Sequence, residues 1–376
     1  VLKNNRVYSS NLAGPIHILN QSNQSLDLNI EYNHITHERP FDSHLGGPAL
    51  KILTGVATGL PGSGTTTGSV YGNTITTNGP EGIGIEGYSD TTVELDIAGN
   101  ELTGGLNGAI YAIREFDSGS LDLNIGNNAM YPYNDEVYRG VNIDVVDGTA
   151  RADIINNTVL QAFDGFKLFE SPGASLNVNL YNNIMAYCDA PVFIDSTTTI
   201  NNDYNLLYMN NSSSLSFTPG PNHIATNPMV MGMQNARLRS GSPAIEAGNS
   251  LQLLLLGGTP FVDADGTIRI KKGDDSVGAP QVDIGAYETG DLYFTHTVEN
   301  SISHISPINH VELNGQPGLD DLHVTANWNP PGSAGIYNDD NEGIYYELGS
   351  WRVFNEGLTD FNTGAAFNIH QFANSN

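Results

Sequence analysis

Charged residues recur at matching positions of a strand-like phrase in the middle of the chain. The phrase is apolar at alternate positions and appears as GIGIE, GAIYAI, GVNIDV, GFKLFE and PVFID. We take its charged members as outward positions of one stripe: Glu86, Arg114, Asp144, Lys167, Glu170 and Asp195. Carboxylates aligned in this way could act as general acid and base on a polysaccharide or hold calcium, while Arg or Lys pairs with a uronate. The alternative is that the charges are simple ladder pairs between neighbouring strands.

Two Asp-rich segments carry residues that could bind calcium through carboxylate and backbone oxygens. Asp263 and Asp265 lie in DADGT, whereas Asp339 and Asp340 lie in YNDDNEG. Asp-Gly is also ordinary turn chemistry, so a structural explanation stands beside the metal site. The histidines show no H-x-H or H-E-x-x-H spacing, which favours structural or surface roles over zinc. Calcium is therefore the only cofactor for which the sequence offers candidates.

Aromatic residues of the C-terminal region could form a platform on which sugar rings stack. The candidates are Trp328, Tyr345 and Trp351. A small β domain also needs aromatic residues for its core, and we favour that explanation. The sequence contains no Gly-x-Ser-x-Gly elbow, P-loop or dinucleotide fingerprint, so acyl transfer and nucleotide chemistry are not expected.

The charge balance of the chain argues against several classes of partner. Asp and Glu number 41 against 14 Lys and Arg, which gives a formal charge of −27. A nucleic acid or an anionic membrane surface would be repelled. The apolar run at 251–258 is too short to span a bilayer, and the single Cys188 excludes an intramolecular disulfide framework. The chain begins at Val1 without a signal peptide, so we expect a processed product or a segment of a longer precursor.

The elements that must position these side chains form a repeat marked by asparagine. LDLNIEYNHI begins at Leu26, and related phrases follow through the next coils. The marker residues are Asn33, Asn73, Asn100, Asn128, Asn157, Asn183 and Asn205. Successive markers are 40, 27, 28, 29, 26 and 22 residues apart. We attribute the long first step to an inserted loop over residues 54–69, because that stretch has loop composition.

A short period built from alternating strands, without helical periodicity, predicts an all-β fold: a right-handed parallel β-helix. Stacked coils would place equivalent side chains in columns about 4.8 Å apart and close a continuous core. We expect Leu121, Leu123 and Ile125 to face inward, with Asn128 at a bend between strands. Asn tolerates the left-handed conformation that such a bend needs, and its amide can bond the backbone or the Asn of the next coil.

The stretch after Asn205 resembles the closing segment of a known family. SGSPAIEAG at 240–248, DADG at 263–266 and VDIGAYE at 282–288 are similar to the end of secreted bacterial β-helix proteins of the choice-of-anchor cell-surface type. The resemblance implies a secreted or cell-surface protein without fixing an activity. With the repeats, the resemblance predicts a β-helix domain at residues 1–290. Residues 291–376 are expected to form a small β-sandwich-like module, which resembles an accessory β domain of unnamed function.

These observations lead us to expect an extracellular structural or adhesive protein, either a subunit of a surface filament or a stalk that presents a binding module. Its partner would be an extracellular polysaccharide, a neighbouring surface protein or another copy of the chain. The alternative is a secreted polysaccharide lyase or glycoside hydrolase that uses the charged stripe. A third hypothesis, a lectin-like module on an inert stalk, assigns glycan binding to residues 291–376.

Overall fold

The structure is a computed structural model of the 376-residue chain. It forms two compact units, which are described separately: residues 1–270 with 281–288, and residues 271–280 with 289–376. The description that follows leaves out residues 11–13, 22, 39–46, 56–62, 116–118, 134–137, 195–197, 211–216, 240, 257–261, 267–268, 270–280, 290–291, 299–302, 309–321, 327–341, 349 and 372–376.

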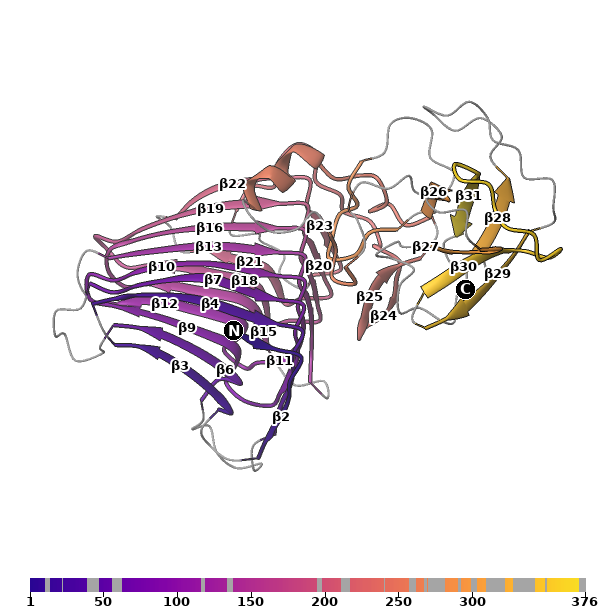
Figure 1. The fold of residues 1–376 in the computed structure, drawn as a ribbon. Coiled ribbons are helices and arrows are strands. Elements are labelled where there is room, and N and C mark those ends of the chain that lie inside the picture. The colour runs from indigo at the N-terminus through magenta and orange to yellow at the C-terminus, as the bar shows by residue number, and fades with distance from the viewer. Residues whose placement is uncertain are drawn as a thin grey trace. The chain divides into compact units, whose positions relative to one another are not determined.

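The first unit is a parallel β-helix whose coils contribute one strand to each of three parallel sheets (Figure 1). Sheet A contains β1 (Leu2–Lys3), β4 (Ser25–Glu31), β7 (Thr65–Tyr71), β10 (Thr92–Ala98), β13 (Ser120–Gly126), β16 (Thr149–Ile155), β19 (Ser175–Tyr181) and β22 (Thr199–Asp203). Sheet B contains β2 (Arg6–Ser9), β5 (His34–His37), β8 (Thr74–Thr77), β11 (Glu101–Gly104), β14 (Ala129–Tyr131), β17 (Thr158–Leu160), β20 (Ile184–Ala186) and β23 (Leu206–Tyr208). Sheet C contains β3 (Ile16–Asn20), β6 (Leu50–Thr54), β9 (Glu81–Tyr88), β12 (Gly108–Glu115), β15 (Arg139–Val145), β18 (Asp164–Glu170) and β21 (Ala190–Ile194). The all-β, parallel β-helix prediction is therefore confirmed.

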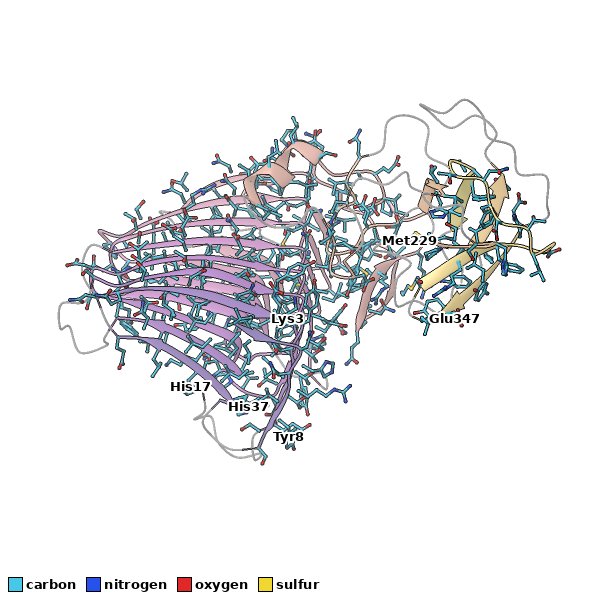
Figure 2. The ribbon with its side chains drawn as sticks, in the orientation of Figure 1. Lys3, Tyr8, His17, His37, Met229 and Glu347 are labelled. Atoms are coloured by element: carbon cyan, nitrogen blue, oxygen red, sulfur yellow. The ribbon has the colours of Figure 1, made fainter. Side chains whose placement is uncertain are left out.

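The core of this unit follows from the period-two alternation of its strands. Leu121, Leu123 and Ile125 are at most 1% exposed, as predicted, and they align with apolar residues of the strands on either side. The first coil also contacts its neighbour through side chains that are partly exposed. Lys3 pairs with Glu31 at 2.8 Å, and both Lys3 and Tyr8 are labelled among the first strands in Figure 2.

The marker asparagines form a continuous buried ladder between sheets A and B. Each Oδ1 accepts hydrogen bonds, within 3.0 Å, from the backbone N–H and the Nδ2 of the Asn one coil earlier. Each Nδ2 also donates to a carbonyl of the preceding coil, as Asn128 does to Ile97. The ladder begins one coil earlier than the sequence suggested, because Asn5 donates to Asn33 in the same way. Every amide is thus bonded to its neighbouring coils, which fixes their register.

The left-handed conformation belongs to the residue before each ladder asparagine, and not to the ladder residue itself as expected. Those preceding residues have φ between 53° and 63°: Asn4, Tyr32, Gly72, Gly99, Asn127, Asn156, Asn182 and Tyr204. This division of roles explains the Asn-Asn pairs, because the first Asn takes the strained backbone and the second supplies the ladder amide.

The loop predicted over residues 54–69 is shorter than expected. Thr54 ends β6, and β7 already begins at Thr65, with both Thr54 and Thr66 fully buried. Their hydroxyls are joined by a 2.7 Å hydrogen bond. The polar composition of this stretch predicts a loop and not strands. Threonine is nevertheless tolerated in a core when its hydroxyl group has a hydrogen-bond partner.

A closing segment covers part of the outer face of sheet B. It includes β24 (Val230–Gly232), β25 (Asn235–Leu238) and residues 281–288, whereas the short 3-10 helix η1 (Ser250–Leu256) packs against β13 and β16 of sheet A. Ile284, Ala286 and Tyr287 pack with outward residues of the later sheet B strands in a second apolar cluster: Ala129, Tyr131, Leu160, Ile184, Ala186 and Leu206.

The left-handed asparagines bind this closing segment. Asn127 Nδ2 donates to the carbonyl of Val262 at 2.9 Å, and Asn156 Nδ2 donates to that of Asp283 at 2.7 Å. Arg269 and Glu288, whose side chains are both 0% exposed, form a 3.2 Å ion pair beneath the segment. The covered face of sheet B is therefore part of the structural interior of this unit.

The second unit contains two antiparallel three-stranded sheets. One orders β26 (Leu292–Thr297), β31 (Ala366–Gln371) and β28 (Leu322–Ala326), and the other orders β27 (Ile305–Ile308), β30 (Ser350–Asn355) and β29 (Glu342–Glu347). Their core includes Val353, Phe361 and Phe367, each at most 1% exposed. This agrees with the small β region that the sequence predicts.

Candidate functional site: an acidic groove on sheet A

The predicted charged stripe divides between two outward columns of sheet C. Glu86 and Asp144 share one column, and Lys167 lies in the neighbouring one. Glu86 pairs with Lys51 at 2.6 Å, and Asp144 pairs with Lys167 at 2.9 Å. These contacts are the ladder pairs that the sequence offered as the alternative to a catalytic stripe.

Arg114 and Glu170 are not outward residues, which corrects the stripe. Arg114 is 0% exposed, and its Nη1 donates to the carbonyls of Gly87 and Glu115 at 2.9 and 2.7 Å. Glu170 Oε2 accepts a 2.6 Å hydrogen bond from the backbone N–H of Leu176. Both charges therefore stabilise the backbone at the end of sheet C. Asp195 lies outside the described residues.

A groove of about 600 Å³ lies on the outer face of sheet A. Its lining comes from five consecutive sheet strands, with one residue of η1: Asp27, Leu28, Asn29, Thr67, Gly68, Ser69, Glu94, Leu95, Asp96, Asp122, Asn124, Arg151 and Leu255. Strand pairing places the polar members in two columns, so each step along the groove advances one coil, or about 4.8 Å. Four such steps give a length of roughly 19 Å.

The hollow arises because small residues on β7 stand between longer ones on β4 and β10. Thr67 lies between Asp27 and Glu94 in one column, and Ser69 lies between Asn29 and Asp96 in the other. Gly68 between them has φ of +132°, and a Cβ there would collide with the carbonyl oxygen of Leu28. Only glycine fits at this position, so the depression is built into the backbone.

Hydrogen bonds and ion pairs hold the side chains at the end of the groove that lies over β13 and β16. Asn124 Nδ2 donates to Asp96 at 2.7 Å, and Arg151 contacts both Asp122, at 3.5 Å, and Asp153. Asn179 Nδ2 donates to the second oxygen of Asp153 at 2.6 Å. Arg151 is therefore held by two carboxylates and leaves little positive charge for the rest of the groove.

Burial raises the pKa of Asp153 above the usual carboxyl value, although Asn179 and Arg151 favour its charged form. Its side chain is 0% exposed, whereas those of Asp122 and Arg151 are each 44% exposed. Asp153 can thus position Arg151, but a ligand in the groove reaches Asp122 instead.

The expected calcium ligands of the DADG motif have structural partners. Asp263 is 1% exposed and accepts hydrogen bonds from the backbone N–H groups of Asp265 and Glu288, at 2.9 and 2.8 Å. Asp265 is bound by the guanidinium of Arg237. Within the described part of the chain, no group of three or more His, Cys, Asp or Glu residues is arranged to hold a metal ion. Asp339 and Asp340 lie outside those residues.

The aromatic residues of the second unit support its core. Trp351 is 8% exposed and packs edge to face with Tyr346 at 5.7 Å, so it does not present a free stacking surface. Tyr345 is half-buried and meets Phe354 at 5.5 Å. Trp328 is not among the described residues. Trp351 therefore belongs to the core of the second unit and does not contribute to the predicted sugar platform.

Comparison with known proteins gives one match. Residues 281–371 match a family described as a domain of unknown function, DUF7452. The match includes all of VDIGAYE and most of the second unit, and it leaves the three parallel sheets outside. Neither the curated proteins nor the solved structures contain a match to this chain. In the helices that the structure describes, none is long and apolar enough to cross a membrane.

Sequence reasoning missed the groove, although the repeated phrase contains its residues. LDLNI, VELDI and LDLNI place Asp or Glu, then Asp or Asn, at the two outward positions of β4, β10 and β13. The apolar positions and the asparagine of the phrase explain the fold, so the phrase is easily taken as scaffold alone. Its remaining positions line the groove.

Proposed function

We propose that this protein is an extracellular, non-catalytic polysaccharide-binding protein of structural or adhesive type, located at a cell surface or secreted. The supporting observation is the polar groove on sheet A, which is open to solvent and continuous over five strands. An extended polymer with many hydroxyl groups suits such a groove, because carboxylates, amides and hydroxyls repeat along it at nearly constant spacing.

The rigid β-helix supports this role. Binding groups on neighbouring strands are held in register by backbone pairing and by the asparagine ladder, so a ligand would lose little free energy in ordering them. The strands β1, β2 and β3 are edge strands of their sheets, so assembly with another chain is compatible with this proposal.

The proposal is tested by filling the hollow without changing its charge. Thr67→Trp should abolish retardation of the protein in affinity electrophoresis gels that contain a polysaccharide retarding the wild type. Asn177→Trp is the matched control, because Asn177 lies in the same outward column beyond the groove lining. If both variants are retarded like the wild type, or no polysaccharide in a broad panel retards the wild type, the groove is not the binding site.

A glycoside hydrolase is the second candidate because of one observation. A buried carboxyl with a raised pKa, Asp153, lies near the exposed Asp122, and such a difference in environment is typical of an acid and its partner. The burial of Asp153 argues against direct contact with substrate. New reducing ends released by the wild type, and lost in Asp122→Asn, would favour the enzyme; release without loss would exclude this pair.

A further inference from the structure

The groove has an excess of negative charge that its own residues do not balance. Its lining holds four carboxylates, Asp27, Glu94, Asp96 and Asp122, and one cation, Arg151. Arg151 is engaged by Asp122 and by the buried Asp153. Among the described residues, Asp27, Glu94 and Asp96 have no ion-pair partner.

Two amide oxygens beneath the same surface lack a hydrogen-bond donor within the described part of the chain. Asn29 Oδ1 and Asn124 Oδ1 are buried and have no donor among the groups that the structure describes. The orientation of Asn124 is fixed, because its Nδ2 donates to the carboxylate of Asp96 at 2.7 Å. A flipped amide would instead place two acceptor oxygens together. The acceptors that a ligand can reach are therefore mainly the four carboxylates of the lining, and a ligand that carries N–H donors complements them.

We propose that the groove selects a polymer of amino sugars with free, protonated amines over neutral and uronate polysaccharides. This inference rests on the polysaccharide-binding function proposed above. Uronates would be repelled by the four carboxylates, and neutral sugars would leave the charge of Asp27 and Glu94 unbalanced. An ammonium group supplies three donors and a positive charge, while the sugar hydroxyls bind Thr67 and Ser69.

The geometry favours a chain over a single small cation. The two unpaired carboxylates of the first column, on Asp27 and Glu94, are two coils apart, or about 9.6 Å, and Asp96 lies on the second column. One bound cation cannot reach all three at hydrogen-bonding distance. A chain lying across the strands, along the stack of coils, can place successive amines near them.

The test uses three hexasaccharides that differ in charge: glucosamine, N-acetylglucosamine and galacturonate. Isothermal titration of the full chain in mildly acidic buffer should give about tenfold tighter binding of the glucosamine hexamer than of its acetylated form, a difference that falls with added salt. Glu94→Gln and Asp96→Asn should each weaken glucosamine binding by about threefold. Glu356→Gln changes the net charge equally on an exposed turn outside the groove, and it should have no effect.

The outcomes separate this inference from the function on which it rests. Equal binding of the glucosamine and acetylated hexamers, lost in Thr67→Trp, would overturn charge selection and keep the polysaccharide groove. Displacement of the glucosamine hexamer by poly-lysine of matched charge at equal concentration would overturn selection of a sugar. Binding of none of the three hexamers would overturn both. The Glu94→Gln and Asp96→Asn variants should unfold at the same temperature as the wild type. A loss of binding then reflects the groove and not a loss of folded protein.

Discussion

The outer faces of sheets A and B come from the same repeated phrase, but part of one forms an open groove and part of the other is covered. Sheet A keeps polar outward residues from β4 to β19, and part of its surface is an open groove. Sheet B carries Thr or Glu outward at β8 and β11, but is mostly apolar from β14 onward and is covered there by the closing segment. The inward residues of both sheets build one core, so the outward residues alone decide whether a face is buried or left for a ligand.

The largest effect is expected where the cover meets sheet B. Arg269→Ala should lower the free energy of unfolding by about 3–5 kcal/mol, because it leaves the fully buried carboxylate of Glu288 without its cation. Urea unfolding measures the loss, and hydrogen exchange of residues 281–288 shows whether the cover detaches.

The matched control for this prediction is the arginine of the open face. Arg151→Ala removes a guanidinium that is 44% exposed, and the buried carboxylate of Asp153 keeps its hydrogen bond from Asn179, so the loss should be smaller, about 1 kcal/mol. Equal losses in the two variants would contradict the distinction between a covered and an open face.

The second prediction concerns the ladder that joins the two sheets. Asn128→Leu should lower the free energy of unfolding by about 3 kcal/mol, because the buried N–H of Asn100 loses its acceptor and the carbonyl of Ile97 and Oδ1 of Asn157 each lose a donor. Asn124→Leu, four residues earlier on the open face, removes a hydrogen bond to Asp96 and should cost about 1 kcal/mol. Thermal and urea unfolding of the pair measure the difference, and a smaller loss in the ladder variant would show that the ladder is not a main support.

Much of the fold can be predicted from the sequence because its signals are local and repeated. Alternation identifies the inward residues, and the spacing of Asn128 and its relatives identifies the coils. The cover over sheet B is also encoded: NAMY and NIMA are apolar on both faces and NTVL has one outward Thr, whereas NTITT and NELTG are polar on the outer face. Those phrases give the same period whether or not their outer face is covered, so the repeat alone does not reveal the cover.

The candidate site is harder to predict because charge alone does not distinguish a ligand surface from a structural pair. Arg114 and Glu170 lie near strand ends where their charges bind the backbone, and Trp351 is needed by a small core. The groove depends on Thr67, Gly68 and Ser69 being small beside longer neighbours on other strands. That contrast becomes visible only when the register between coils is known.

The third prediction concerns the floor of the open face. Gly68→Ala should cost about 2 kcal/mol, because its new Cβ would collide with the carbonyl of Leu28 in addition to the left-handed strain. Gly173→Ala has similar strain, at φ of +99°, and no atom within 4 Å of the new Cβ, so about 1 kcal/mol is expected. The difference between the two losses in urea unfolding measures the collision alone, and equal losses would mean that the backbone at β7 can relax.

The smallest effect is a pH dependence at the end of the groove. Burial gives Asp153 a raised pKa in the folded state, so the folded protein binds this proton more tightly than the unfolded chain does. The resulting stability is present below the ordinary Asp pKa of about 3.9 and is lost as the pH rises through the raised pKa. Asp153→Asn cannot ionise, so its stability relative to the wild type should increase across that window and become constant above it.

The charged neighbours of Asp153 determine how far this window extends. Arg151 on the same strand and the amide of Asn179 on β19 favour the carboxylate, whereas Asp122 on β13 opposes it. The adjacent η1 has no acidic residue in its first turn and no basic residue in its last. Asn179→Ala removes one group that favours the carboxylate, so it should extend the window to higher pH. Urea unfolding at a series of pH values tests both variants, and a difference between wild type and Asp153→Asn that does not change with pH would show that Asp153 titrates alike in the folded and unfolded states.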